Sequence, residues 1–249
     1  MTRKWMTCTL ALIIGFSLSG CKLGKKSGPA NSSASQANGG EVGVEKGKPE
    51  PGTGNVQGKV LYNSKPAENI EVKLCEKFNR FFGGCSGKTF TAKTDKDGEY
   101  VITKVEPMEY EALMARVFET DSYIFATSGI AGLSAKKYDV TADKTFFAPP
   151  TNLYKGDLKL VNPKAGAKVS ADGLELKWEA YDDAAYYKFS IFPEEASVTS
   201  PYINERVDGT SFAIDKPLTK GTYRWQVEAY NSSDKKLSES SNDIKFTID

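Results

Sequence analysis

The chain has 249 residues, with 33 basic and 32 acidic side chains and no histidine. A nearly neutral chain lacks the positive charge that nucleic-acid phosphates attract, so no nucleic-acid partner is expected. The absence of histidine excludes Ser-His-Asp and Cys-His catalysis, histidine zinc sites and histidine pH switches. An enzyme could still use carboxylates, lysine or tyrosine, but together with the fold predicted below the missing histidine leads us to expect a protein that is not an enzyme, with no catalytic residues, no metal ligands and no cofactor.

Residues 1–20 have the pattern of a secretory signal peptide. Arg3 and Lys4 precede the short apolar run TLALIIGFSL, which ends in LSGC at residues 18–21. A membrane-spanning helix needs about twenty apolar residues, so a shorter run behind a basic start predicts a cleaved signal. The ending resembles the lipobox of bacterial lipoproteins, which implies a diacylglycerol on Cys21 and cleavage before it. The alternative is an uncleaved anchor or a chance cysteine.

The lipid on Cys21 would bind the chain to a membrane, because two or more acyl chains anchor a protein stably. Three lysines follow at the membrane surface, and each could add about 1 kcal/mol of binding to anionic lipid; they are Lys22, Lys25 and Lys26. In enteric lipoproteins an aspartate at the position of Lys22 causes retention at the inner membrane. The resemblance therefore implies the cell envelope of a bacterium, and the outer membrane if the host is Gram-negative.

Residues 21–55 are expected to form the lipidated cysteine and a disordered linker. The segment is rich in glycine, serine, asparagine, proline and charge, and it contains no aromatic residue. Such a composition cannot bury enough apolar surface to offset the entropy of ordering. As a flexible coil the linker would span about 30 Å and hold the folded part away from the bilayer.

Residues 56–150 are predicted to be one all-β domain. Apolar and polar residues alternate with period two in several short runs, and no convincing helical period occurs before residue 149. In NIEVKL, for example, Ile70, Val72 and Leu74 share one face. The runs are VQGKVLY, NIEVKL, KTFTAKT, GEYVITKV and YEALMARVF, and residues 122–140 are expected to add a strand and a loop.

The order of features in this domain resembles the carboxypeptidase regulatory-like, or transthyretin-like (prealbumin-type), β-sandwich family. The likeness covers about residues 56–147 and rests on Gly58, Val60, Pro66, Val72, Thr94, Asp95, Gly98 and Tyr100. The glycine that the family usually has in the PMEY stretch, residues 107–110, is missing. The resemblance implies an accessory or binding fold without peptidase activity.

The stretch TDKDGEY could be read as a calcium loop or as a tight turn. An EF-hand loop with Gly98 at its sixth position would need acids at positions 93 and 104. Both positions are lysines. A turn with Asp97 and Gly98 at its tip is therefore expected.

Cys75 and Cys85 remain once Cys8 has left with the signal and Cys21 is lipidated. An even pair in an exported protein predicts a disulfide, and two cysteines alone cannot complete a structural zinc site.

The loop that this disulfide would close, CEKFNRFFGGC, is the candidate ligand-binding site of the chain. Its aromatic and basic residues are Phe78, Arg80, Phe81 and Phe82. An exposed apolar patch marks a binding site, and a closed loop loses less entropy on binding. The alternative is that the rings fold back over the open end of the sandwich, because most apolar side chains find cover.

Residues 157–249 show a second alternating pattern, which predicts a half-buried antiparallel sheet. Leu174, Leu176 and Trp178 share one face. A later run does the same with Tyr223, Trp225, Val227 and Ala229.

The second pattern resembles a bacterial fibronectin type III domain, which has an immunoglobulin-like fold. The likeness rests on Pro163, Gly166, Leu176, Trp178, Ala185, Tyr187, the run from Leu218 to Ala229 and the closing SNDIKFTI. It implies that Trp178 is the core tryptophan. It also implies that Tyr223 is a corner tyrosine whose hydroxyl bonds upstream backbone.

Two further groups in this domain could be functional or merely structural. Asp182 and Asp183 are adjacent, so a solvated loop is a better interpretation than an acid/base pair across a cleft. Tyr181, Tyr186 and Tyr202 could form an aromatic ligand surface or belong to ordinary packing.

The sequence thus predicts two tandem antiparallel β-sandwiches behind a signal peptide and a linker. The expected function is that of a membrane-anchored, non-enzymatic binding lipoprotein of the bacterial cell envelope, with a protein or glycan ligand held by loops or strand edges. Adhesion and carbohydrate binding are both compatible with this expectation. The alternative is a structural accessory subunit of a periplasmic or outer-membrane assembly.

Overall fold

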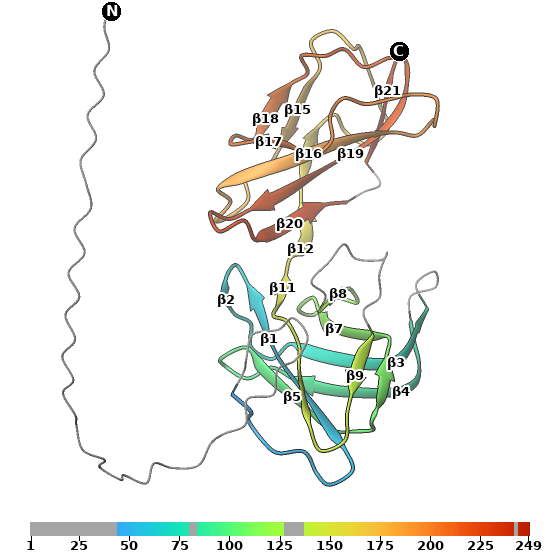
Figure 1. Cartoon of the computed structure of the whole chain (residues 1–249). Coiled ribbons are helices and arrows are strands. Elements are labelled where there is room, and N and C mark those ends of the chain that lie inside the picture. The colour runs from blue at the N-terminus through green and yellow to red at the C-terminus, as the bar shows by residue number, and fades with distance from the viewer. Residues whose placement is uncertain (1–43, 80–83, 127–136, 242–243) are drawn as a thin grey trace, which may run out of the picture. The chain divides into compact units, whose positions relative to one another are not determined.

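Figure 1 shows the computed structural model of the chain, which describes residues 44–79, 84–126, 137–241 and 244–249. The predicted signal peptide, the lipidation site Cys21 and the loop residues Arg80, Phe81 and Phe82 lie outside these ranges. The described residues form β-strands and contain no α-helix. Accordingly, no helix in this part of the chain has the length and apolar character needed to cross a membrane. The predicted all-β chain of tandem sandwiches is confirmed.

The first sandwich places two main sheets against each other around one core. Strand β1 is central in the first sheet; it pairs antiparallel with β2 and β5, and parallel with β10 and β11. These strands are β1 (Gly54–Tyr62), β2 (Lys65–Pro66), β5 (Glu99–Val105), β10 (Thr145–Phe147) and β11 (Thr151–Leu153).

The facing sheet has the strand order β4-β3-β7-β8, and β6 pairs with β9 in a separate ladder. The bounds are β3 (Glu71–Asn79), β4 (Gly84–Lys93), β6 (Met108–Tyr110), β7 (Ala112–Arg116), β8 (Tyr123–Phe125) and β9 (Tyr138–Val140). Ile70, Val72 and Leu74 all face the core, as their alternation predicts. The finer resemblance to the carboxypeptidase regulatory-like family stays a prediction.

Residues 44–53, which composition assigns to the disordered linker, are held against this sandwich. The Gln57 side chain accepts the Lys46 N–H at 3.0 Å and donates to the Val44 carbonyl at 2.8 Å. Asn55 donates to the Gly47 carbonyl at 3.0 Å. The expected linker is therefore too long at its C-terminal end. Composition misses this because two buried amide side chains, and no apolar residue of the segment, hold it in place.

The turn between β4 and β5 forms as predicted. Asp95 Oδ1 accepts the backbone N–H groups of Asp97 and Glu99, each at 2.9 Å. Gly98 has a φ of 72°, and a Cβ there would lie 2.5 Å from the Val60 carbonyl oxygen. The second carboxylate oxygen of Asp95 pairs with Lys46 at 2.8 Å, which lowers the pKa of Asp95 to about 2.

The second sandwich has one large and one small sheet around its own core. The large sheet has the order β12-β20-β19-β16-β17, extended by β21 on β19 and by β14 on β21; the small sheet has the order β13-β15-β18. The bounds are β12 (Lys155–Leu158), β13 (Leu160–Asn162), β14 (Ala167–Val169), β15 (Glu175–Trp178), β16 (Tyr186–Pro193), β17 (Glu205–Val207), β18 (Ser211–Ala213), β19 (Gly221–Tyr230), β20 (Lys236–Ser240) and β21 (Lys245–Ile248).

The two aromatic predictions for this sandwich are confirmed. Trp178 lies in the core, with its ring against Tyr187 and Phe189. The Tyr223 hydroxyl donates to the Thr219 carbonyl at 2.8 Å, which is the upstream backbone bond of a tyrosine corner.

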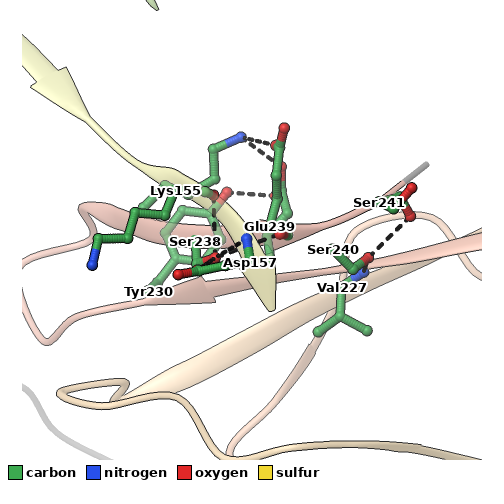
Figure 2. Close-up of polar contacts among 10 residues, drawn as sticks. Lys155, Asp157, Val227, Tyr230, Ser238, Glu239, Ser240 and Ser241 are labelled. Atoms are coloured by element: carbon green, nitrogen blue, oxygen red, sulfur yellow. Dashed lines mark hydrogen bonds and ion pairs between the residues drawn. The ribbon is translucent and has the colours of Figure 1, made fainter. Parts of the chain in front are cut away.

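Polar contacts attach β12 to β20, as Figure 2 shows. The fully buried hydroxyl of Ser238 lies 2.8 Å from Asp157 Oδ1 and 3.1 Å from the Lys155 carbonyl. Further along β20, the Ser240 hydroxyl accepts the Val227 N–H at 3.0 Å. A single residue, Tyr154, separates β11 of the first sandwich from β12 of the second.

Candidate binding site on the first sandwich

The predicted disulfide is present and joins β3 to β4. Cys75 and Cys85 have Cα atoms 5.5 Å apart. Cys75 lies opposite Thr89 and Phe78 lies opposite Cys85, with a bulge between the two pairs. The disulfide therefore fastens the hairpin beside this bulge, close to the loop that contains Arg80, Phe81 and Phe82.

Phe78 folds back onto the sheet. Its ring packs edge-on against Phe125 with centroids 5.0 Å apart, beside a small cluster of Cys75, Ala112 and Met114. The chain neighbours of this cluster, such as Leu74 and Leu113, belong to the main core, so the cluster lies on the opposite face of the sheet. For Phe78 the fold-back alternative is correct, although the ring covers a sheet face rather than an open end.

A ligand contact by Phe78, Arg80, Phe81 and Phe82 stays a prediction, because three of the four lie outside the described residues. The observation that matters more for binding is next to them. Strand β4 is the terminal strand of its sheet and is ten residues long. Among the described residues its only ladder partner is β3.

The direction of the β4 backbone groups follows from the hydrogen bonds of three backbone N–H groups. The Glu111 N–H is shared between the carbonyls of Cys75 at 3.0 Å and Glu76 at 3.3 Å, and the shorter bond places Cys75 toward β7. The Leu113 carbonyl accepts the Ala126 N–H, so Leu113 faces away from β3 and its partner Leu74 faces β4. The Thr94 N–H donates to the Ile70 carbonyl in the same register. Backbone groups alternate sides along a strand, so Phe90 and Ala92 also face β3. The N–H and C=O groups of residues 89, 91 and 93 consequently face away from the sheet.

These outward groups are available to a partner. No backbone or side-chain partner for the N–H and C=O groups of Thr89, Thr91 and Lys93 is found among the described residues. The three side chains are exposed, whereas Phe90 and Ala92 are half-buried against the core. Residues 89–93 therefore form a flat, open edge with a polar face and an apolar face.

The other half of β4 is not flat. Gly87 has a φ of 75°, and the Lys88 N–H is taken by the Glu76 carboxylate at 2.9 Å. A bulge of this kind twists an edge strand and blocks pairing. The usable edge is thus confined to residues 89–93.

The exposed side of the hairpin is basic. Strands β3 and β4 carry four lysines and two glutamates, a formal charge of +2. Both glutamates are engaged: Glu76 with the Lys88 backbone, and Glu71 with the Tyr123 hydroxyl at 2.9 Å. Lys88 pairs with Glu106, while Lys77 makes no ion pair with any described residue.

Aromatic residues on the outer face of the second sandwich are covered by their neighbours. The rings of Tyr186 and Tyr230 stack with centroids 5.1 Å apart and planes 2° apart. The Arg206 guanidinium lies 3.9 Å over Tyr186, and the Lys188 ammonium lies 4.9 Å from the Tyr230 centroid. Tyr202, by contrast, is buried and donates to Asp215 at 2.7 Å. Ordinary packing is thus the correct interpretation for Tyr186 and Tyr202.

The sequence did not predict the contact between Tyr186 and Tyr230. The alternation of buried and outward residues along each strand does place both side chains on the outer face. Burial raises the pKa of the Tyr230 hydroxyl, and its hydrogen bond to Glu228 at 2.6 Å raises it further. Burial would lower the pKa of Lys236, but contacts with Glu239 and Glu228 outweigh it, so this pKa is raised. Both groups keep their ordinary charge at neutral pH, which stabilises the face as a closed network.

A polar hollow of about 450 Å³ lies beside β12, with Tyr181 and Asp157 in its lining. Asp157 Oδ1 already accepts from the hydroxyls of Tyr181 and Ser238. Asp182 and Asp183 are exposed at its rim, in the solvated loop predicted for them. The acid best placed to hold a ligand is therefore used in structural bonds.

Comparison with known proteins finds no matching family model and no matching curated protein. Similar solved structures include a leucine-rich repeat protein from Bacteroides thetaiotaomicron (14% identity, 80% of this chain, 25% of that chain, TM-score 0.28). The fibronectin(III)-like modules of Clostridium thermocellum CbhA are 15% identical, with 78% of this chain and 90% of that chain covered and a TM-score of 0.28. The major pilin SpaD from Corynebacterium diphtheriae is 11% identical, with 77% of this chain and 66% of that chain covered and a TM-score of 0.25. This chain spans about a quarter of the leucine-rich repeat protein. Likeness at this level carries no functional conclusion.

Proposed function

We propose that this chain is a membrane-anchored, non-enzymatic binding lipoprotein of a bacterial cell envelope, and that it contacts a protein partner through the β3–β4 hairpin. The observation that carries the proposal is the open edge of β4 at residues 89–93. An exposed strand edge is a template for another chain unless it is short, bulged or covered. This one is flat over five residues and is fixed to its neighbour by a disulfide.

A protein is favoured over a glycan as the partner. Sugars bind proteins by stacking on open aromatic faces, with hydrogen bonds at the rim. On the outer face of the second sandwich, the rings of Tyr186 and Tyr230 stack on each other, and a cation lies against each ring. These rings therefore offer no open face to a sugar. A backbone edge instead offers donors and acceptors that another backbone matches.

Anchoring at the envelope rests on the lipobox-like residues 18–21 and on the polar segment that follows Cys21. We propose that the lipid on Cys21 holds the chain at the membrane, and that the segment up to residue 43 spaces the sandwiches from it. Cys21→Ser should move the chain from the membrane fraction to the soluble fraction. Retention of this variant at the membrane would contradict lipid anchoring.

Site-specific crosslinking in intact cells tests the contact. A photoreactive phenylalanine analogue replaces Lys77 in the hairpin or, as the control, Lys235 in a turn of the second sandwich; both positions are exposed. The proposal predicts one discrete protein adduct from position 77 and none from position 235. Equal labelling at both positions, or no adduct from 77, would contradict the hairpin as the contact surface.

A further inference from the structure

We propose that residues 89–93 of β4 accept an extended acidic segment of the partner protein as an added antiparallel strand. This inference rests on the proposed function and specifies its binding mode and partner chemistry. It uses only the described edge and does not depend on the loop at residues 80–83.

The geometry of the edge matches an extended peptide. Thr89, Thr91 and Lys93 each direct one N–H and one C=O away from β3, as the bonds of Cys75 and Thr94 establish. Alternate residues of a strand are about 6.7 Å apart, which is the spacing at which an antiparallel partner presents its own paired groups. Pairing over five residues would satisfy the open groups without any movement of β4.

The two faces of the edge require two kinds of side chain in alternation. On one face the added strand would lie beside Thr89, Thr91 and Lys93, which are exposed. On the other face it would lie beside Phe90 and Ala92, which are half-buried against the core. An alternating sequence of acidic and apolar residues fits both faces, because cross-strand neighbours on one face interact directly.

Charge disfavours the most obvious competitor, a second copy of this chain. Pairing of β4 with β4 would bring together two hairpins that each carry a formal charge of +2. Like charges across a strand pair are destabilising, whereas an acid next to Lys93, the charged residue of the open edge, is stabilising. The occupant is therefore an acidic strand and not the same edge of another molecule.

The test uses synthetic peptides and the full chain purified in detergent. The probe is a fluorescein-labelled octapeptide of alternating glutamate and valine, and its control replaces glutamate by lysine. Fluorescence anisotropy should show saturable binding of the glutamate peptide and binding at least about tenfold weaker for the lysine peptide. Affinity should fall as salt is raised from low concentration.

Peptide N-methylation separates strand addition from attraction by charge, and it leaves the protein unchanged. In an antiparallel pair, residues on the same face as Thr91 direct their N–H groups toward β4. Methylation of the glutamate nitrogens should weaken binding by about tenfold or more, while methylation of the valine nitrogens should change it by less than about threefold. Equal affinity of the two methylated peptides would overturn the proposal.

A matched pair of variants tests the protein side. Thr91→Pro removes an outward N–H but no ladder bond to β3, so the edge should lose the peptide while the fold persists. Thr91→Val keeps the N–H and should bind as the parent does. Peptide binding by Thr91→Pro, with the fold verified by circular dichroism, would overturn the proposal.

Two further outcomes keep the inference separate from the proposed function. A hairpin adduct in cells together with no binding of the glutamate peptide would overturn strand addition and leave the proposed function standing. Self-association of the purified chain that Thr91→Pro abolishes would show that a second copy occupies the edge, which also overturns the acidic partner.

Discussion

The two sandwiches treat their sheet edges differently. In the first, β4 is a terminal strand of ten residues with a flat stretch of five. In the second, the terminal strands have three or four residues each; they are β12, β13, β14, β17 and β18. Short edges discourage pairing with other chains, and a long flat edge invites it. The comparison shows that, among the described strands, the long flat edge belongs to the first sandwich, where we propose the contact with a partner.

The two sandwiches are also stabilised by different means. The second sandwich has a core built around two tryptophans and a tyrosine corner, and its outer face is closed by stacked tyrosines and cations. The first sandwich adds a disulfide to a core without tryptophan. The β3–β4 hairpin of the first sandwich is thus cross-linked by a covalent bond, which the second sandwich does not use in its described residues.

The largest expected loss of stability comes from a substitution in the core of the second sandwich. Trp225 is fully buried, so Trp225→Ala should lower the free energy of unfolding by about 3–5 kcal/mol. Urea unfolding followed by the fluorescence of Trp178 measures it. Ile203→Ala is the matched control, because the Ile203 side chain is 47% exposed and its loss should cost little. Similar losses for the two variants would contradict the assigned core.

The disulfide comes next and should act on the first sandwich alone. The double variant Cys75→Ser, Cys85→Ser opens a ten-residue separation, which costs about 3 kcal/mol in the chain-entropy model. Unfolding followed by tyrosine absorbance should shift, while the transition reported by Trp178 and Trp225, both in the second sandwich, should stay in place. A shift of the tryptophan transition would show that the two sandwiches do not differ as described.

Removal of one tyrosine hydroxyl from each sandwich should change the free energy of unfolding by a smaller amount, with opposite signs in the two sandwiches. Tyr223→Phe removes the corner bond to Thr219 and should destabilise the second sandwich by about 1 kcal/mol. The Tyr100 hydroxyl is buried, and no partner is found for it in the described part of the chain. Tyr100→Phe should therefore leave the first sandwich as stable or up to about 1 kcal/mol more stable. A lower melting temperature for both variants would contradict this difference between the two hydroxyls.

The smallest effect concerns acid stability of the first sandwich. Lys46 and backbone N–H groups lower the pKa of Asp95 from 3.8 to about 2. A folded-state pKa below the unfolded value stabilises the fold above about pH 4, and this contribution disappears as the pH falls toward 2. Asp95→Asn and Lys46→Gln should each flatten the pH dependence of unfolding in this range. A slope equal to that of the parent would show that residues 44–53 are not held by this pair.

Much of the core could be predicted from alternation alone. Tyr223, Trp225, Val227 and Ala229 are buried on one face as period two requires, and the cysteine count gave the disulfide. Local patterns suffice here because each residue's facing direction is set by its own strand.

Other features depend on pairs that no local pattern reveals. The edge position of β4 is a result of which strands pair, and Tyr186 meets Tyr230 only because β16 and β19 are neighbours. The side-chain amides of Gln57 and Asn55 bind residues 44–47 by hydrogen bonds. Nothing in the composition separates these two amides from those of other asparagines and glutamines. The sequence therefore predicted a site in the loop of this hairpin, which stays a prediction, and gave no sign of the open backbone along its edge.

The most direct test of the open edge is amide hydrogen exchange of β4 in the free protein, read residue by residue by NMR. The structure predicts alternation: fast exchange at Thr89, Thr91 and Lys93, whose N–H groups face outward, and slow exchange at Phe90 and Ala92, which bond β3. Slow exchange at all five positions would show that the edge is already covered, and would contradict the account of β4 as a surface open to a partner strand.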